Sequence, residues 1–89
     1  MGQINFKIKV MPSSPSIDLE KIKRDFKNMI EKSGGKSCSF TEEPIAFGLK
    51  AVIAMFLWPE EKEFEPTENK LSTIKDVSSV QVIDMRRAL

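Results

Sequence analysis

One uninterrupted apolar run, Ala51–Trp58, lies inside an expected strand over Leu49–Trp58 and restricts the folds that this chain of 89 residues can adopt. Alternate side chains of an extended segment point to opposite faces, and in this run both faces are apolar. One face would carry Val52, Ala54 and Phe56, and the other Leu49, Ala51, Ile53 and Met55. Such a strand is typical of the interior of a sheet. Since crossing a bilayer takes ~20 apolar residues, we expect a central strand and no contact with a membrane.

Alternation also predicts a strand at the N-terminus, whose buried side would carry Ile4, Phe6, Ile8 and Val10. The Pro- and Ser-rich segment 12–15 is expected to end it. A helix should begin at Asp18, which can cap backbone N–H groups, and end at Ser33, before the glycines 34 and 35. Spacings of three and four predict one apolar stripe on this helix, made of Leu19, Ile22, Phe26, Met29 and Ile30.

The other segments complete a repeating order. We expect a second strand over Lys36–Glu43, with Cys38 and Phe40 facing inward, and a loop over Glu42–Gly48. After an acidic loop at 59–65, a short helix with Pro66 in its first turn should lead to a last strand over Val77–Met85. The order β-α-β-β-α-β predicts a ferredoxin-like α+β sandwich, a four-stranded antiparallel sheet with two helices on one face. The length leaves room for one core, so residues 1–89 should form a single domain.

The second face of this sheet is expected to be open and apolar. By alternation it would be shared by Leu49, Ala51, Ile53, Met55, Ile83 and Met85. Exposed apolar patches mark interaction surfaces, so weak self-association through this face is one interpretation. The other is that the inner and outer faces are partly exchanged.

The composition excludes several kinds of site. There is no His, which removes His acid–base catalysis and His-ligated metal. The single Cys38 can form neither an intramolecular disulfide nor a thiolate metal site, and we expect it to be a small buried residue. A net charge of +1 argues against a dedicated nucleic-acid binder. We therefore expect no cofactor, no metal and no catalytic residue, in a cytoplasmic protein without a signal peptide.

The carboxylate pairs of the chain do not change this expectation. Glu42–Glu43 and Glu60–Glu61 could be mistaken for acid–base dyads. Without a second catalytic group we interpret them as solvated turn charges.

The loop after the second strand carries large apolar residues, which loops normally lack. Phe47 could fold back and cap the core, or project as an aromatic anchor for a partner protein. Gly48 can adopt a positive φ and allows another chain to approach closely. At the C-terminus, Arg86 and Arg87 are expected just past the last strand, where guanidinium groups can clamp a carboxylate or phosphate or simply be solvated.

The segment Glu43–Leu49, which reads Glu-Pro-Ile-Ala-Phe-Gly-Leu, resembles the signature of the archaeal-type translation elongation factor 1 beta family. The segments 8–12 and 84–87 resemble the same family at the same places in the chain. The resemblance implies the same fold and a guanine-nucleotide exchange factor, which speeds GDP release from elongation factor 1 alpha without covalent chemistry of its own. It implies that Phe47 and its neighbours contact the GTPase. Our full hypothesis for the contact surface adds the open sheet face and the two arginines to this loop, and its candidate residues are Pro44, Ile45, Ala46, Phe47, Gly48, Leu49, Lys50, Arg86 and Arg87.

One position departs from the family. Larger eukaryotic relatives carry, next to the C-terminal residue, a Lys that is thought to enter the Mg²⁺ site, whereas this chain has Ala88. Arg86, Arg87 or Lys50 could supply the cation instead, or the metal could leave by another route.

Two alternatives share the predicted fold. An RNA-recognition module would need aromatic stacking platforms on its central strands, and the N-terminal strand offers Asn5, Lys7 and Lys9 there. A small phosphate hydrolase would need an Arg and a Gly-rich anion loop after the first strand, where this chain has Met-Pro-Ser-Ser-Pro-Ser at 11–16. Neither alternative explains the loop at 44–50.

Overall fold

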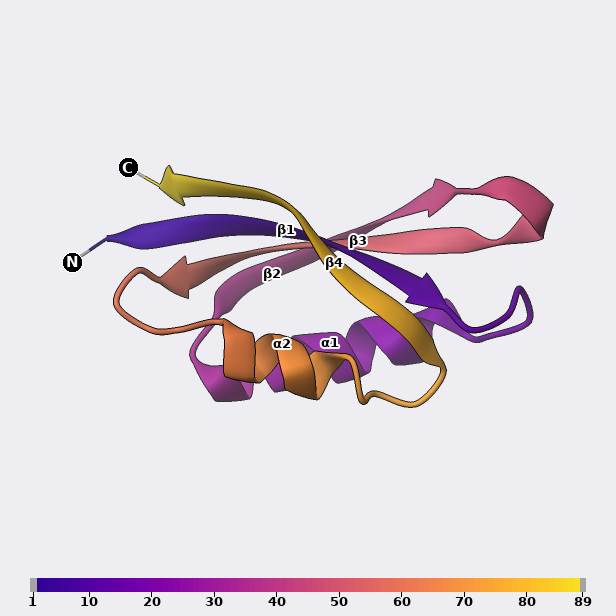
Figure 1. Cartoon of the computed structure of the whole chain (residues 1–89), viewed down its shortest axis with the longest axis horizontal. Helices are drawn as coiled ribbons and strands as arrows, with labels where there is room; N and C mark the ends of the chain where they lie inside the picture. The colour runs from indigo at the N-terminus through magenta and orange to yellow at the C-terminus, as the bar shows by residue number, and fades with distance from the viewer. Residues whose placement is uncertain (1, 89) are drawn as a thin grey trace.

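A single antiparallel sheet covered on one face by two helices makes up the computed structural model, which describes residues 2–88 (Figure 1). The elements are β1 (Gln3–Pro12), α1 (Leu19–Ser33), β2 (Lys36–Pro44), the 3-10 turn η1 (Ala46–Gly48), β3 (Lys50–Pro59), α2 (Glu65–Leu71) and β4 (Val77–Ala88). The strand order is β2-β3-β1-β4, and every neighbouring pair is antiparallel. The predicted ferredoxin-like arrangement is confirmed. Within residues 2–88, neither helix has the length and hydropathy of a bilayer-crossing segment.

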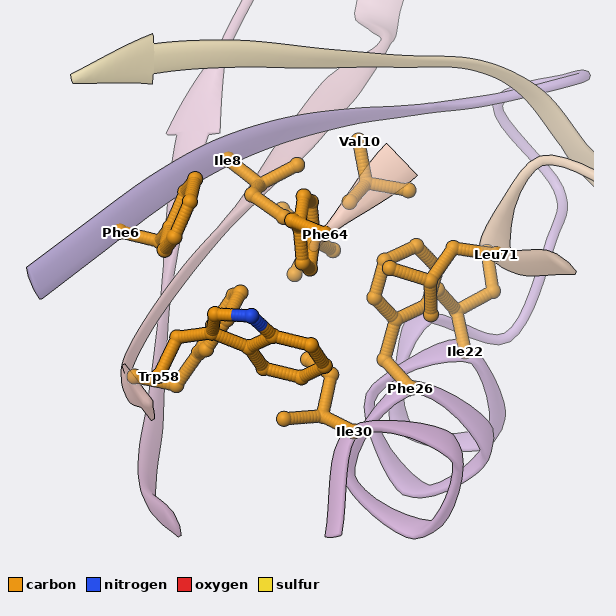
Figure 2. Close-up of a cluster of buried hydrophobic side chains, with 11 residues drawn as sticks. Phe6, Ile8, Val10, Ile22, Phe26, Ile30, Trp58, Phe64 and Leu71 are labelled. Carbon is orange, nitrogen blue, oxygen red and sulfur yellow. The ribbon is translucent and has the colours of Figure 1, made fainter. Parts of the chain in front are cut away.

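The core lies between the helices and the inner face of the sheet (Figure 2). Four aromatic rings pack together at its centre, with the centroids of contacting rings 4.6–6.2 Å apart; they belong to Phe6, Phe56, Trp58 and Phe64. The predicted apolar stripe of α1 packs against these rings from the helical side of the core. The Trp58 indole N–H donates to the backbone carbonyl of Lys62 at 2.8 Å, so its polar atom is satisfied.

The ends of α1 follow from its sequence. The Asp18 carboxylate accepts the Glu20 N–H at 3.1 Å, as an N-cap should. Gly34 takes the left-handed conformation with φ 112°, and the Gly35 N–H donates to the Ile30 carbonyl at 2.9 Å. Gly35 is packed so closely that a Cβ there would clash with Ile30 and lie 3.3 Å from the Trp58 ring.

Three strands extend beyond their predicted ends because backbone pairing continues. β1 reaches Pro12, which pairs with Val77 after a register shift. β2 reaches Pro44, so of the two overlapping expectations for Glu42 and Glu43 the strand over Lys36–Glu43 is confirmed, and the loop begins only after Pro44. β4 continues to Ala88, which places both C-terminal arginines inside the strand and not beyond it.

The expectation of a broad apolar outer face is wrong. On this face Ala51 and Ile53 are buried, and Ile53 lies in register between Lys9 of β1 and Thr41 of β2. The aliphatic stems of lysines can cover such neighbours while their charges stay in water. Leu49 is in the loop before β3 and not on the sheet.

A β-bulge in β4 accounts for the rest of the difference. Lys7 pairs with Asp84 and Ile8 with Val82, so Ile83 is an extra residue. The insertion shifts the alternation by one position, because the side-chain period of a strand is two. Met85 therefore pairs with the inward-facing Phe6 and is not on the outer face, where its neighbours Asp84 and Arg86 lie.

Candidate functional site

The loop of the β2–β3 hairpin, residues 45–49, lies at one end of the long axis of the molecule (Figure 1). The chain measures 42 × 20 × 18 Å along its principal axes. Both termini lie at the opposite end. The loop is thus the tip of the hairpin and is held by the two strands behind it.

The sequence closes this loop in a defined way. Pro44 is the last residue of β2 and pairs with Lys50, the first of β3. The Ile45 N–H donates to the Leu49 carbonyl at 2.7 Å, and the Leu49 N–H donates to the Ala46 carbonyl at 3.3 Å. Ile45 and Leu49 are half-buried and form the base of the loop, whereas Ala46 is exposed.

Phe47 stands outside the protein at the tip. Its side chain is 94% exposed. The alternative that Phe47 caps the core is therefore wrong in this structure. Its backbone is left-handed, with φ 63° and ψ 30°, a conformation that costs a residue with a side chain roughly 1–2 kcal/mol. The next residue, Gly48, is left-handed too, with φ 77°.

A cleft of about 290 Å³ lies beside the hairpin. Gly48, Lys50 and Glu42 line it from the hairpin, and the segment 12–20, which includes the start of α1, lines it from the other side. Lys50, predicted to contact a partner, is exposed at its edge. The cleft therefore joins the hairpin to the β1–α1 loop in one surface.

An ion-pair network ties the hairpin to α1 next to this cleft. The Lys23 ammonium lies 2.7 Å from a Glu42 carboxylate oxygen and 2.9 Å from one of Glu20. The hydrogen bonds to Glu42 and Glu20 raise the pKa of Lys23. The hydrogen bond from Lys23 lowers the pKa of Glu42. The Lys23–Glu42 pair could not be predicted from the sequence, because the two residues lie 19 positions apart and are brought together only by the fold.

The two predicted arginines lie at the other end of the sheet. Arg86 pairs with Asn5 of β1, which in turn pairs with Leu57 of β3. Leu57 is seven residues beyond Lys50, or roughly 23 Å at the rise of a strand. The structure therefore gathers residues 44–50 at one end and does not bring Arg86 or Arg87 to them.

The arginines also point to opposite faces of the sheet, as successive residues of a strand do. Arg87 pairs with Ile4 on the core side and forms an ion pair with Glu60. Arg86 is on the outer side, with its Nε 3.1 Å from the Asp84 carboxylate. Each guanidinium thus has a carboxylate partner. Glu60 lies in the turn after β3, as expected, and its partly exposed charge is paired with Arg87.

Reactive groups are few in the described part of the chain. Residues 2–88 hold no cluster of three or more His, Cys, Asp or Glu side chains placed to bind a metal ion. Cys38 is half-buried, and burial followed by the nearby Glu31 raises its pKa to about 11. Its thiol is therefore protonated at neutral pH.

Known proteins resemble the chain over nearly its whole length. Residues 5–88 match the EF-1 guanine nucleotide exchange domain. The chain is 36% identical over 87 residues to Elongation factor 1-beta of Methanococcus maripaludis, a match that covers 96% of this chain and 97% of that protein. It is 41% identical over 90 aligned positions to Elongation factor 1-beta of Methanothermobacter thermautotrophicus, covering 100% of both chains.

Two solved structures share the arrangement of the backbone at low sequence identity. LarC2, the C-terminal domain of a cyclometallase, matches with a TM-score of 0.65 and 11% identity, over 100% of this chain and 58% of that chain. The C-terminal domain of MgtC from Mycobacterium tuberculosis matches with a TM-score of 0.60 and 12% identity, over 99% of this chain and 88% of that one. At these identities the likeness shows the fold alone.

The left-handed backbone of Phe47 predicts an order of stability for two variants. Both Phe47→Gly and Phe47→Ala remove an exposed ring, but only glycine adopts a positive φ without strain. We expect Phe47→Gly to be more stable than Phe47→Ala by about 1 kcal/mol, despite the greater entropy of glycine in the unfolded chain. Urea unfolding measures the difference. A more stable alanine variant would contradict the observed loop conformation.

The Lys23–Glu42 ion pair predicts a pH-dependent stability. Because the folded pKa of Glu42 is lowered, the pair stabilises the fold above the unfolded pKa and is lost as pH falls through the folded one. Glu42→Gln should lower the melting temperature at pH 7. The difference from the native chain should shrink once pH falls below the ordinary Glu pKa of about 4.3 and vanish below the lowered pKa of the folded state. The control is the adjacent exposed Glu43→Gln. A difference in melting temperature between Glu42→Gln and the native chain that persists at pH 2 would contradict an electrostatic origin of the stabilisation.

Proposed function

Because the chain belongs to the family of EF-1 guanine nucleotide exchange domains, we propose that it accelerates GDP release from elongation factor 1 alpha. GTP then binds in place of GDP. On this proposal residues 1–89 act as one exchange domain in the cytoplasm, where translation takes place.

The exposed ring of Phe47 is the observation from the structure that supports this proposal most directly. An exchange factor changes no covalent bond; it binds the nucleotide-free GTPase more tightly than the GDP-bound form. It therefore needs a surface complementary to the GTPase. An aromatic side chain that is 94% exposed can gain binding energy by entering a pocket of a partner.

The rest of the hairpin end extends this surface. Lys50 and Gly48 lie along the cleft next to the loop, so the partner can contact a continuous surface there. On this proposal Phe47 is the anchor, Lys50 is a flanking charge contact, and the remaining residues of 44–49 contact the partner around them.

The arginines offer a second point of contact. GDP is held in GTPases by backbone amides and Mg²⁺, and a cation brought to the phosphates would compete with the metal. Arg86 and Arg87 are the candidates, with Lys50 at the hairpin as the third. Since the arginines lie roughly 23 Å from Lys50 along the sheet, the proposal requires the GTPase to be contacted at both ends of the molecule.

The anchoring role of Phe47 predicts a specific kinetic defect. Release of a fluorescent GDP analogue from the cognate elongation factor 1 alpha should accelerate as the protein is added. Phe47→Ala should raise the half-maximal concentration by roughly 30-fold, or about 2 kcal/mol, with an unchanged melting temperature. Ile83→Ala is the matched control, because Ile83 is also an exposed apolar residue but lies in the bulge of β4.

Two outcomes would argue against the proposal. No acceleration by the folded native chain at any concentration would reject nucleotide exchange on this GTPase. Equal defects in Phe47→Ala and Ile83→Ala would reject Phe47 as the anchor.

The opposite orientation of the arginines predicts unequal effects in the same assay. Only the guanidinium that faces the phosphates can act on them, so one of Arg86→Ala and Arg87→Ala should lower the maximal release rate roughly tenfold, as expected for a charged hydrogen bond. The other should stay near the native rate, and the double variant should match the stronger single variant. If both single variants lowered the maximal release rate equally, and the double variant lowered it by the product of the two factors, the prediction that only one arginine acts on the phosphates would be wrong.

A further inference from the structure

We propose that Gly48 is a positioning residue, whose left-handed backbone holds the loop in the conformation that presents Phe47 to the GTPase. The inference rests on the proposed function and adds to it the residue that orients the anchor.

Phe47 adopts a conformation that its own side chain disfavours. Its φ of 63° is rare for a residue other than glycine, asparagine or aspartate. No core packing holds the ring, because it is 94% exposed. The conformation must therefore be imposed by the neighbouring backbone.

The loop supplies that constraint from two sides. The bond from the Ile45 N–H to the Leu49 carbonyl and the pairing of Pro44 with Lys50 fix the two ends of the loop. Between them the chain must reverse within three residues, and it does so with Phe47 and Gly48 both left-handed. Gly48 can take φ 77° without strain, so the conformation rests on it.

A glycine can be required because the backbone has a positive φ or because a side chain would collide with its surroundings, and the space around Gly48 distinguishes these two reasons. A Cβ built at this position has nothing within 4 Å, so a side chain would not collide with the protein. Inside the free molecule, position 48 is therefore sensitive to backbone conformation and not to crowding. A substitution there should change which loop conformations are populated and leave the core intact.

Such a change has a kinetic signature. If only a fraction of the molecules hold Phe47 outward, the apparent affinity for the partner falls by that fraction, while the rate at saturation is kept. A loss of folded protein would instead show as a lower melting temperature.

The experiment compares L-alanine with D-alanine at position 48, the latter introduced by chemical synthesis of the 89-residue chain. Both chains add one methyl group, but D-alanine favours positive φ and L-alanine disfavours it. Gly48→Ala should raise the half-maximal concentration for GDP release about 5- to 10-fold, with the maximal rate and the melting temperature near native values. Because Gly48 also lies in the contact surface, the D-alanine chain is compared with the L-alanine chain and not with the native one. The D-alanine chain should need at least threefold less protein for half-maximal release than the L-alanine chain, and Gly48→Asn should fall between the two.

Scalar couplings and amide contacts of residues 46–49, measured by NMR on the free chains, test the conformation without the GTPase. The native and D-alanine chains should show the left-handed pair, and Gly48→Ala should show a mixture of conformations. An unchanged loop in Gly48→Ala would overturn the inference, whatever the exchange assay shows.

The exchange assay adds two further outcomes that would overturn it. Equal loss in the L- and D-alanine chains would mean that the methyl group blocks the partner, so that Gly48 serves close approach and not positioning. Native activity in both chains would mean that the backbone at 48 positions nothing. If Phe47→Ala itself had no effect, the anchor of the proposed function would fail, and the NMR comparison would still decide the role of Gly48.

Discussion

Burial of alternate side chains of β1 and β3 against α1 is the constraint on which the remaining structure depends. Phe6, Ile8 and Val10 face the helices together with Phe56 and Trp58. A slip of one residue in either strand would turn the core side chains of that strand to the opposite face of the sheet, so the register is fixed strongly. The fixed register in turn determines where the hairpin tip projects from the sheet and which arginine lies on the core side.

Much of this frame could be predicted from the sequence, because periodicity reports burial. The stripe of α1, its cap at Asp18 and the alternation in β1 each have a local physical cause, and each lies where expected. The bulge could not be predicted in the same way. Val82 and Ile83 are adjacent apolar residues, which the sequence also allows to face opposite sides of a regular strand, and only the pairing of β4 with β1 shows that Ile83 is an extra residue.

The candidate site shows the same division between local and long-range information. An apolar residue next to a glycine in a loop was visible in the sequence, but whether Phe47 points inward or outward depended on the space left by the core. The hairpin tip extends beyond Val52, the core residue of β3 nearest to it, so Phe47 projects past the end of the core. Likewise, the pairs Lys23–Glu42 and Arg87–Glu60 join residues far apart in the chain, so no local pattern could reveal them.

The bulge at Ile83 also protects the free edge of β4. An edge strand exposes backbone N–H and C=O groups on which another chain can add a strand, and β4 spans 12 residues. Beyond the bulge, the Asp84 carboxylate accepts the N–H of Met85 at 2.9 Å, so a charged side chain occupies a backbone donor. A kinked edge bearing the charges of Asp84 and Arg86 is a poor template for an incoming strand. The irregularity that removes Met85 from the outer face thus also guards a small protein with a long exposed strand against aggregation.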